Sequence, residues 1–234
     1  MTHPIALAGA LLLSTLPQLP AAELVANGEP ASKLVVSEGW RPVGGFLQST
    51  GVSHLTPQAG IGDGDFRITA RMRLDKLERS ACGLVLGNSF FGFAGAHGKM
   101  FITGKLFDGA RGLPIGEPKD HLTNGRQFDF EVVRQGGRIQ FAIDGKVVLE
   151  RKFTTNVIGR FGFAPSRAVM AIRDLRVAGN LHARYVNYIP PEEAYRTRTV
   201  PGVDKVILLP PAPGNPRNSE GDFVRLKDGR ILFT

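Results

Sequence analysis

Cysteine and aromatic residues are scarce in this sequence of 234 residues, which has one cysteine, Cys82, and 8% aromatic residues. One thiol allows no internal disulfide, which excludes a small cystine-stapled scaffold. Because Cys82 lies in an apolar run without a neighbouring histidine, we interpret it as a buried small hydrophobic residue rather than a nucleophile. Hydrophobic residues make up 42% and charged residues 21% of the chain, which excludes disorder, collagen and coiled coils.

Charged side chains are missing from residues 1–22. An apolar stretch over residues 5–16 is followed by two prolines and by the small pair Ala21 and Ala22, an order typical of a secretory signal peptide. The stretch is shorter than the roughly 20 residues of a membrane-spanning helix. We therefore predict a signal peptide over residues 1–22 and a secreted or periplasmic protein without a membrane span. A plain apolar N-terminal helix is the alternative.

Clusters of metal ligands are also missing. The five histidines are scattered, which disfavours a zinc site. Asp63 and Asp65 resemble an oxygen-rich calcium loop, but two acids are too few, so a solvated turn is favoured and no cofactor is expected. The formal net charge of +8 favours acidic partners in general, whereas the lack of a compact basic run interleaved with aromatics disfavours nucleic acid.

Apolar residues do recur with a period of two between about residues 33 and 181. Asp144 and Gly145 separate two such alternating runs and predict a hairpin with a two-residue loop. Many short amphipathic strands can bury a core only by stacking two sheets or by closing a barrel. We therefore predict an all-β fold, an antiparallel β-sandwich, over residues 33–181.

Four segments in a fixed order carry a family resemblance. An opening strand with Trp40 is followed by GDFRITARMRL, FDFEVVRQGGRIQFAIDGKVV and GRFGFAPSRAVMAIRDLRVAG. Their order resembles that of the laminin G and concanavalin A-like jelly rolls, over roughly residues 35–181. The resemblance implies glycan binding, or occasionally glycan hydrolysis, on a concave sheet face; it supports the fold better than the function.

Aromatic and cationic side chains are the glycan-binding candidates of this sandwich. Trp40 and His97 are candidates to stack on sugar rings, and so is the loop over residues 89–93, although its three phenylalanines are interpreted as core. Three arginines of one strand are candidates to hold the carboxylate or sulfate of an acidic glycan: Arg67, Arg71 and Arg73. A solvated strand face is the favoured alternative for these arginines.

Paired carboxylates are the signature of glycan hydrolases, because one group donates a proton while the other attacks or positions water. Asp129 and Glu131 stand two residues apart, which places them on one face of a strand. An exposed strand face with two acids is the favoured interpretation. A concanavalin A-like disaccharide hydrolase is therefore kept as an alternative function.

The chain changes character after residue 181, where prolines become frequent and the tyrosines appear. Residues 182–205 are predicted to be a linker. Residues 206–234 include Arg217 and the segment KDGRILF, and they resemble the opening of the BNR-type β-propeller of exo-alpha-sialidases. The resemblance implies that Arg217 holds the substrate carboxylate, although Arg217 is followed by Asn218 rather than by the usual isoleucine; an ordinary surface arginine is the alternative.

The same resemblance implies that residues 206–234 are the truncated start of a propeller whose later blades supply the catalytic groups. We therefore expect this chain to be inactive even if its parent protein is a sialidase. The leading hypothesis is a glycan-binding accessory sandwich of a secreted sialidase-like glycoside hydrolase, which binds a neutral or acidic glycan or packs against the missing propeller. A non-enzymatic secreted interaction domain is the third function that the sequence leaves open.

Overall fold

The computed structural model describes residues 20–31, 35–36, 39–77, 80–95, 98–153, 156–189, 223–225 and 231–233, with side chains between residues 20 and 189 except at 35–36. The chain divides into two units, Met1–Pro190 and Pro191–Thr234. In the second unit β19 (Phe223–Arg225) pairs antiparallel with β20 (Ile231–Phe233). Residues 1–19 of the predicted signal peptide, His97 and Arg217 lie outside the described residues.

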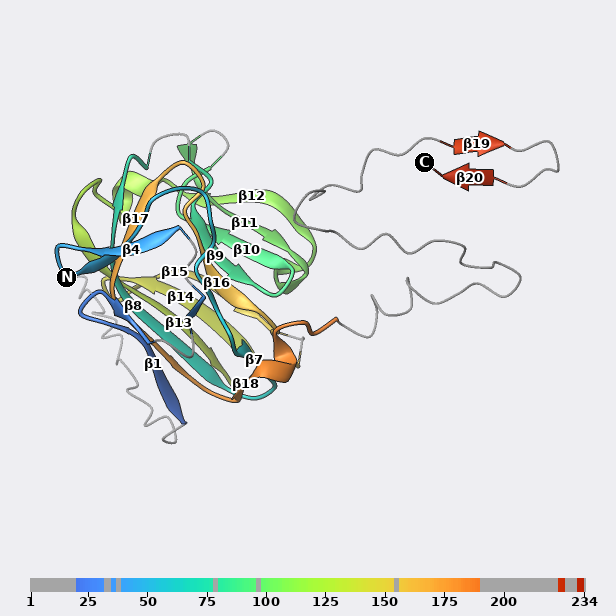
Figure 1. Cartoon of the computed structure of the whole chain (residues 1–234), viewed down its shortest axis with the longest axis horizontal. Helices are drawn as coiled ribbons and strands as arrows, with labels where there is room; N and C mark the ends of the chain where they lie inside the picture. Colours follow the sequence, from blue (N-terminus) through green and yellow to red (C-terminus); the bar gives the residue numbers. More distant parts are fainter. Residues whose placement is uncertain are drawn as a thin grey trace, which may run out of the picture. The chain divides into compact units, whose positions relative to one another are not determined.

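The first unit is built on a large sheet of nine strands. Its path runs through β15, β14, β13, β8, β17, β1 and β2, and β5 joins β17 while β4 joins β5 (Figure 1). The bounds of these strands are Lys146–Lys152 (β15), Arg138–Ile143 (β14), Gln127–Gln135 (β13), Phe66–Asp75 (β8), Val169–Ala178 (β17), Ala21–Ala26 (β1), Glu29–Pro30 (β2), Phe46–Ser49 (β5) and Trp40–Val43 (β4). Every neighbouring pair is antiparallel.

The second layer is a small sheet of five strands in the order β12, β11, β10, β9 and β16 (Figure 1). Their bounds are Ala110–Gly116 (β12), Met100–Gly104 (β11), Ser89–Gly92 (β10), Gly83–Leu86 (β9) and Phe161–Ala164 (β16). Short pairs lie beside the sheets: β3 (Val35–Val36) with β6 (Thr56–Pro57), and β7 (Gly60–Ile61) with β18 (Leu181–His182). Short 3-10 helices lie at Lys105–Phe107, Pro118–Asp120 and Ala183–Tyr185.

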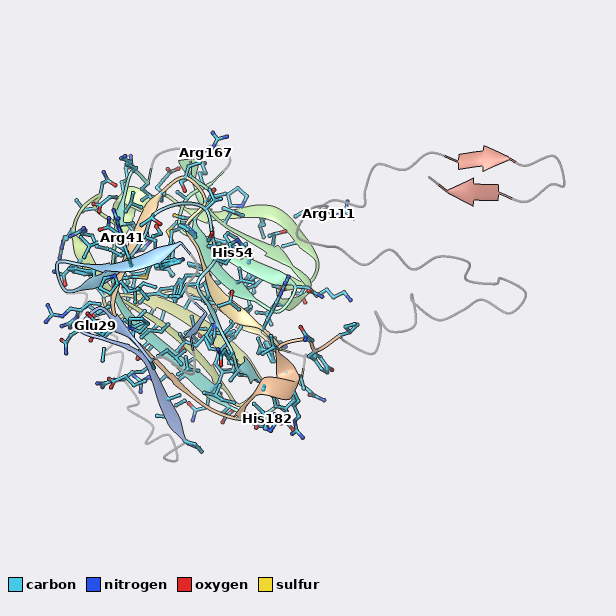
Figure 2. The ribbon with its side chains drawn as sticks, viewed as in Figure 1. Glu29, Arg41, His54, Arg111, Arg167 and His182 are labelled. Atoms are coloured by element: carbon cyan, nitrogen blue, oxygen red, sulfur yellow. The ribbon has the colours of Figure 1, made fainter. Side chains whose placement is uncertain are left out.

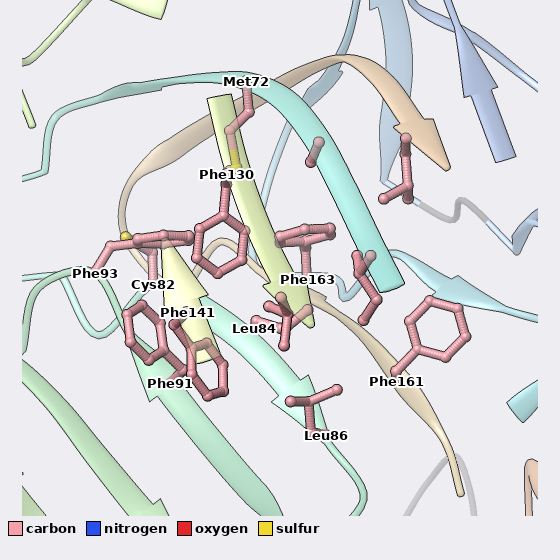
Figure 3. Close-up of a cluster of buried hydrophobic side chains, with 14 of the residues drawn as sticks. Met72, Cys82, Leu84, Leu86, Phe91, Phe93, Phe130, Phe141, Phe161 and Phe163 are labelled. Atoms are coloured by element: carbon pink, nitrogen blue, oxygen red, sulfur yellow. The ribbon is translucent and has the colours of Figure 1, made fainter. Parts of the chain in front are cut away.

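Phenylalanines from both sheets interlock in the core (Figure 3). Phe91 of β10 stacks on Phe141 of β14, with ring centroids 4.6 Å apart and planes within 3° of parallel. Phe93 meets Phe130 of β13 edge to face at 4.9 Å. These contacts join the small sheet to the large one, so the predicted all-β sandwich is confirmed.

Cys82 is also part of this core and is fully buried. Burial raises the pKa of its thiol to about 11. The interpretation as a buried hydrophobic residue is therefore confirmed, because a protonated thiol without solvent access is a poor nucleophile.

The predicted hairpin is also present, since Ile143 pairs with Lys146 across Asp144 and Gly145. Both loop residues have positive φ, 49° and 75°, as a turn between right-twisted strands requires.

The N-terminal limit of the sandwich differs from the predicted residue 33. Strand β1 pairs with β17, with Ala21 opposite Ala178 and Ala22 opposite Val177, so the large sheet begins within the segment predicted as leader. Sequence alternation did not show this strand because its two buried residues, Leu24 and Val25, are adjacent rather than alternating. In the described part of the chain, no helix is long and apolar enough to cross a membrane.

Candidate functional site

The outer face of the large sheet is covered by cross-strand ion pairs. Arg71 donates from Nε to Oδ1 of Asp129 at 2.9 Å, and this hydrogen bond raises the pKa of the guanidinium. Arg67 pairs in the same way with Glu131, which follows Asp129 on the same strand face. In the register of β8 and β13, Asp129 stands directly opposite Arg71. Glu131 stands opposite Thr69 and reaches Arg67 diagonally, so the charges neutralise one another across the two strands.

Arg73, the third predicted arginine, is bound within its own strand. Its Nε donates to Oδ2 of Asp75 at 3.0 Å, and its guanidinium lies over the ring of Phe46. Of the three predicted arginines, Arg67 and Arg71 thus form ion pairs with the predicted acids, and Arg73 forms one with Asp75. This arrangement fits the alternative of a solvated strand face better than a site for an anionic ligand.

Trp40 is a core residue rather than a stacking platform. It is 7% exposed, and its indole Nε1 donates to the backbone oxygen of Ser53 at 2.8 Å. A buried ring offers no face to a sugar, so the prediction for Trp40 is corrected on physical grounds. Within β4 only Trp40 is buried, while the three residues that follow it are exposed.

Asp63 and Asp65 are the two residues named as weak calcium candidates. Asp63 accepts a hydrogen bond from Nδ2 of Asn180 at 2.7 Å. Calcium needs six to eight oxygen ligands. Among the described residues no group of three or more His, Cys, Asp or Glu side chains could hold a metal ion.

The outer face of the small sheet carries a pair of aromatic rings, which we name the phenylalanine platform and define as Phe90 and Phe101. Alternation along β10 sends Phe91 into the core and Phe90 to the outer face, where its ring is half-buried. Phe101 reaches the same face from β11, and the two ring centroids lie 5.7 Å apart with planes inclined by 33°. The platform is therefore continuous across two neighbouring strands.

Glycines beneath the platform let its rings lie flat on the backbone. A Cβ atom on Gly92 would lie 2.1 Å from Cε1 of Phe101, and one on Gly95 would lie 2.2 Å from the same atom. A Cβ on Gly83 would lie 2.8 Å from Cζ of Phe90. Because a side chain at any of these positions would displace a ring, the glycines leave the space that the rings of Phe90 and Phe101 occupy against the backbone.

Polar and apolar side chains border the platform. Val85 and Thr103 stand opposite Phe90 on the neighbouring strands. The hydroxyl of Thr103 donates to the backbone oxygen of Ala110 at 3.0 Å. Pro114, on β12, stands opposite Phe101 and is exposed.

Sequence reasoning named the loop that contains Phe90 but assigned its ring to the core, and it missed Phe101. One signal was available. Residues Met100 to Ile102 are apolar on both phases of the strand, and glycines recur on the strands beside them, which is typical of close approach by another group.

No protein-family model and no curated protein sequence matches this chain. Among solved structures, the exoplasmic/lumenal domain of VIP36, in its Ca2+/Man3GlcNAc-bound form, is similar with a TM-score of 0.50 and 10% identity, over 74% of this chain and 92% of that one. A sialidase of Trypanosoma rangeli, in complex with 2,3-difluorosialic acid, is similar with a TM-score of 0.47 and 14% identity, over 71% of this chain and 31% of that one.

Another sialidase is similar with a TM-score of 0.45 and 14% identity, over 62% of this chain. The similarity spans only 17% of that sialidase. At these identities the likeness to VIP36 shows the jelly-roll fold alone, and what the fold binds must be argued from its own surfaces.

Proposed function

We propose that this β-sandwich is a glycan-binding module and that its glycan stacks on the phenylalanine platform. The observation that carries the proposal is the pair of half-buried rings held flat over glycines on a sheet face. A pyranose has one face of C–H groups, and such a face is complementary to an aromatic ring that is already partly desolvated. Rings fixed by the backbone lose little conformational freedom on binding.

The same platform fits a sugar better than a buried cofactor. Its rings lie on an open sheet surface with hydroxyl and backbone groups at the border, so the equatorial hydroxyls of a stacked sugar stay in contact with water or with polar neighbours. A flat apolar patch also fits a protein partner. The interaction domain predicted as an alternative is therefore the second candidate function.

A catalytic role for the sandwich has less support. Asp129 and Glu131, the closest approach to a paired-carboxylate site, each accept from an arginine on β8. The ion pairs account for both acids as partners of β8, whereas a hydrolase site needs one carboxyl group to donate a proton and the other to attack or to position water. The disaccharide hydrolase is for this reason ranked below glycan binding.

The wider role that we propose is that of an accessory module of a secreted sialidase-like glycoside hydrolase. Its support is the sequence resemblance of residues 206–234 to the opening of a sialidase propeller, together with the antiparallel pairing of β19 and β20 around the segment KDGR. The leader-like composition of residues 1–22 supports secretion.

A glycan array probed with the full chain and with three variants tests the proposal. We expect the full chain to bind a subset of the glycans, and Phe90→Ala and Phe101→Ala each to weaken that binding by about tenfold or more. Val147→Ala is the matched control, because Val147 is 50% exposed on β15 of the other sheet. A folded chain that binds no glycan would overturn the function, and binding that survives both platform variants would overturn the site.

A further inference from the structure

A second surface feature lies where the large sheet ends, at the junction of β4, β5, the turn after β8 and the turn before β17. It is a pocket of about 490 Å3, which we name the basic pocket. The residues that matter to its chemistry are Arg41, Gln48, Thr50, Lys76, Ser166 and Arg167. Arg41 and Arg167 are labelled in Figure 2.

Strand register brings these distant segments together. Gln48 of β5 stands opposite both Arg41 of β4 and Ala171 of β17. Asp75, the last residue of β8, stands opposite Val169, the first residue of β17, so Lys76 and the turn with Arg167 leave the sheet side by side. The pocket is therefore held by the sheet itself and is in place before any ligand arrives.

The charges of the basic pocket are not neutralised by the described part of the chain. Arg41, Lys76 and Arg167 are exposed, and none of them forms an ion pair with another described residue. No acidic side chain is among the described residues that line the pocket. Three cations around one hollow repel one another and attract an anion, in contrast with the arginines of β8, each of which has a carboxylate partner.

The backbone at this pocket is unusual as well. Lys76 and Ser166 have positive φ angles of 56° and 53°. The other described residues with positive φ, apart from glycines, are Asn27, Asp108 and Asp144, which belong to the residue types that tolerate this conformation. Lysine and serine do so at a greater cost, and backbone strain of this kind concentrates at ligand sites.

The pocket also offers neutral hydrogen-bonding groups beside its cations. Thr50 donates its hydroxyl to the backbone oxygen of Gly39 at 2.7 Å, which leaves lone pairs of Thr50 Oγ1 to accept from a ligand. Ser49 Oγ accepts a hydrogen bond from the backbone N–H of Met170 at 3.0 Å, and this bond holds β5 against β17 at the base of the pocket. Gln48, half-buried, supplies an amide. This combination of cations with hydroxyl and amide groups suits an anion that is attached to a hydroxylated molecule.

We propose that the basic pocket binds an anionic oxygen group of a saccharide, a carboxylate or a sulfate ester, through Arg41, Lys76 and Arg167. The saccharide part of this inference rests on the proposed glycan-binding function, whereas the anion part rests on the pocket alone. The two guanidinium groups bind such an oxyanion bidentately, and Lys76 adds a point charge. The phenylalanine platform and the basic pocket lie on different sheets, so they are separate sites.

The test is an amide chemical-shift titration of the full chain with four probes: D-glucuronate, glucose 6-sulfate, glucose and inorganic sulfate. We expect at least one of the two anionic sugars to shift the amide signals of residues 50–52 and 166–168, and glucose to leave them in place. Raising the salt concentration should weaken the effect, because exposed charges are screened. Signals that respond to neither anionic sugar would overturn the proposal.

Two variants and one control assign the effect to the pocket. Arg41→Gln and Arg167→Gln are each expected to weaken binding of the anionic sugar by about tenfold. Arg111→Gln, an exposed arginine on β12 of the other sheet, is expected to leave it unchanged. Equal binding by the wild type and by both pocket variants would overturn the proposal.

The remaining outcomes distinguish glycan stacking on the phenylalanine platform from anion binding in the basic pocket. Inorganic sulfate that binds as tightly as glucose 6-sulfate would overturn the saccharide part, because the sugar would then contribute nothing. Phe90→Ala is expected to leave the glucuronate shifts at residues 50–52 unchanged. If the platform variants have no effect on any glycan while the pocket variants abolish binding of anionic sugars, the platform proposal fails and the pocket proposal stands.

Discussion

The two outer faces of the sandwich differ in what they leave unsatisfied. On the large sheet the charges of β8 and β13 meet as partners, Arg67 with Glu131 and Arg71 with Asp129. On the small sheet the central strands hold glycines and the half-buried rings of Phe90 and Phe101, whose centroids lie 5.7 Å apart. The comparison teaches that a row of charged side chains can already be neutralised by its ion-pair partners. The binding surface that we propose is instead a row of apolar side chains.

The side of the sheet on which a phenylalanine lies decides how much it contributes to stability. The largest expected change in unfolding free energy comes from comparing two adjacent residues of β10. Phe91→Ala removes a fully buried ring that stacks on Phe141 at 4.6 Å, and we expect it to lower the free energy of unfolding by about 3–5 kcal/mol. Phe90→Ala removes a half-buried ring and should cost much less. Urea denaturation of both variants measures this difference, and equal losses would show that Phe90 belongs to the core.

Gly92→Ala disturbs the phenylalanine platform without removing an aromatic ring. Its Cβ would lie 2.1 Å from Phe101, so the ring must move, and we expect a loss of about 1–3 kcal/mol in stability together with weaker glycan binding. Gly116→Ala is the control, because a Cβ there meets nothing within 4 Å. If Gly92→Ala binds glycan as tightly as the wild type, the proposal that the glycan stacks on rings lying flat over the glycines is contradicted.

Arg67→Gln probes the opposite face. Arg67 and its partner Glu131 are both partly exposed, and such pairs contribute less than about 1 kcal/mol. We expect a change in unfolding free energy within that limit and no change in glycan binding. Loss of glycan binding in this variant would move the site to the large sheet and reverse the comparison.

Cys82 lies in the core between the two sheets, and its reactivity toward thiol reagents is expected to be the smallest signal of the native chain. Its thiol has a pKa of about 11 and is fully buried, so a thiol-specific reagent at pH 8 should label the unfolded chain and not the native one. Since the pKa is raised in the folded state, its contribution to stability is present below pH 9 and is lost as the pH rises toward about 11. Rapid labelling of the native chain would show that the layer between the sheets opens.

Period and turn chemistry made the sandwich predictable from sequence. The alternation of residues 66–74 and the Asp144-Gly145 loop are local features, and the structure has both as expected. Trp40 shows the limit of this reasoning, because its phase within a short strand decides between platform and core and depends on which side the second sheet lies.

The sites were harder to predict because they depend on pairing between distant segments. Arg67 and Glu131 are 64 residues apart in the chain, so the register that neutralises them cannot be seen in either strand alone. The platform needs glycines on β9 and β10 beneath rings from β10 and β11. The basic pocket gathers its cations from three separate segments, and no spacing in the sequence marks them.

The most direct measurement of the central claim is a map of amide chemical-shift changes in the full chain, with the glycan that binds most tightly on the array. If the glycan stacks on the phenylalanine platform, the largest changes fall in residues 83–85, 90–92 and 101–103, on the small sheet. Changes concentrated in residues 67–73 and 129–131, on the ion-paired face of the large sheet, would contradict the account.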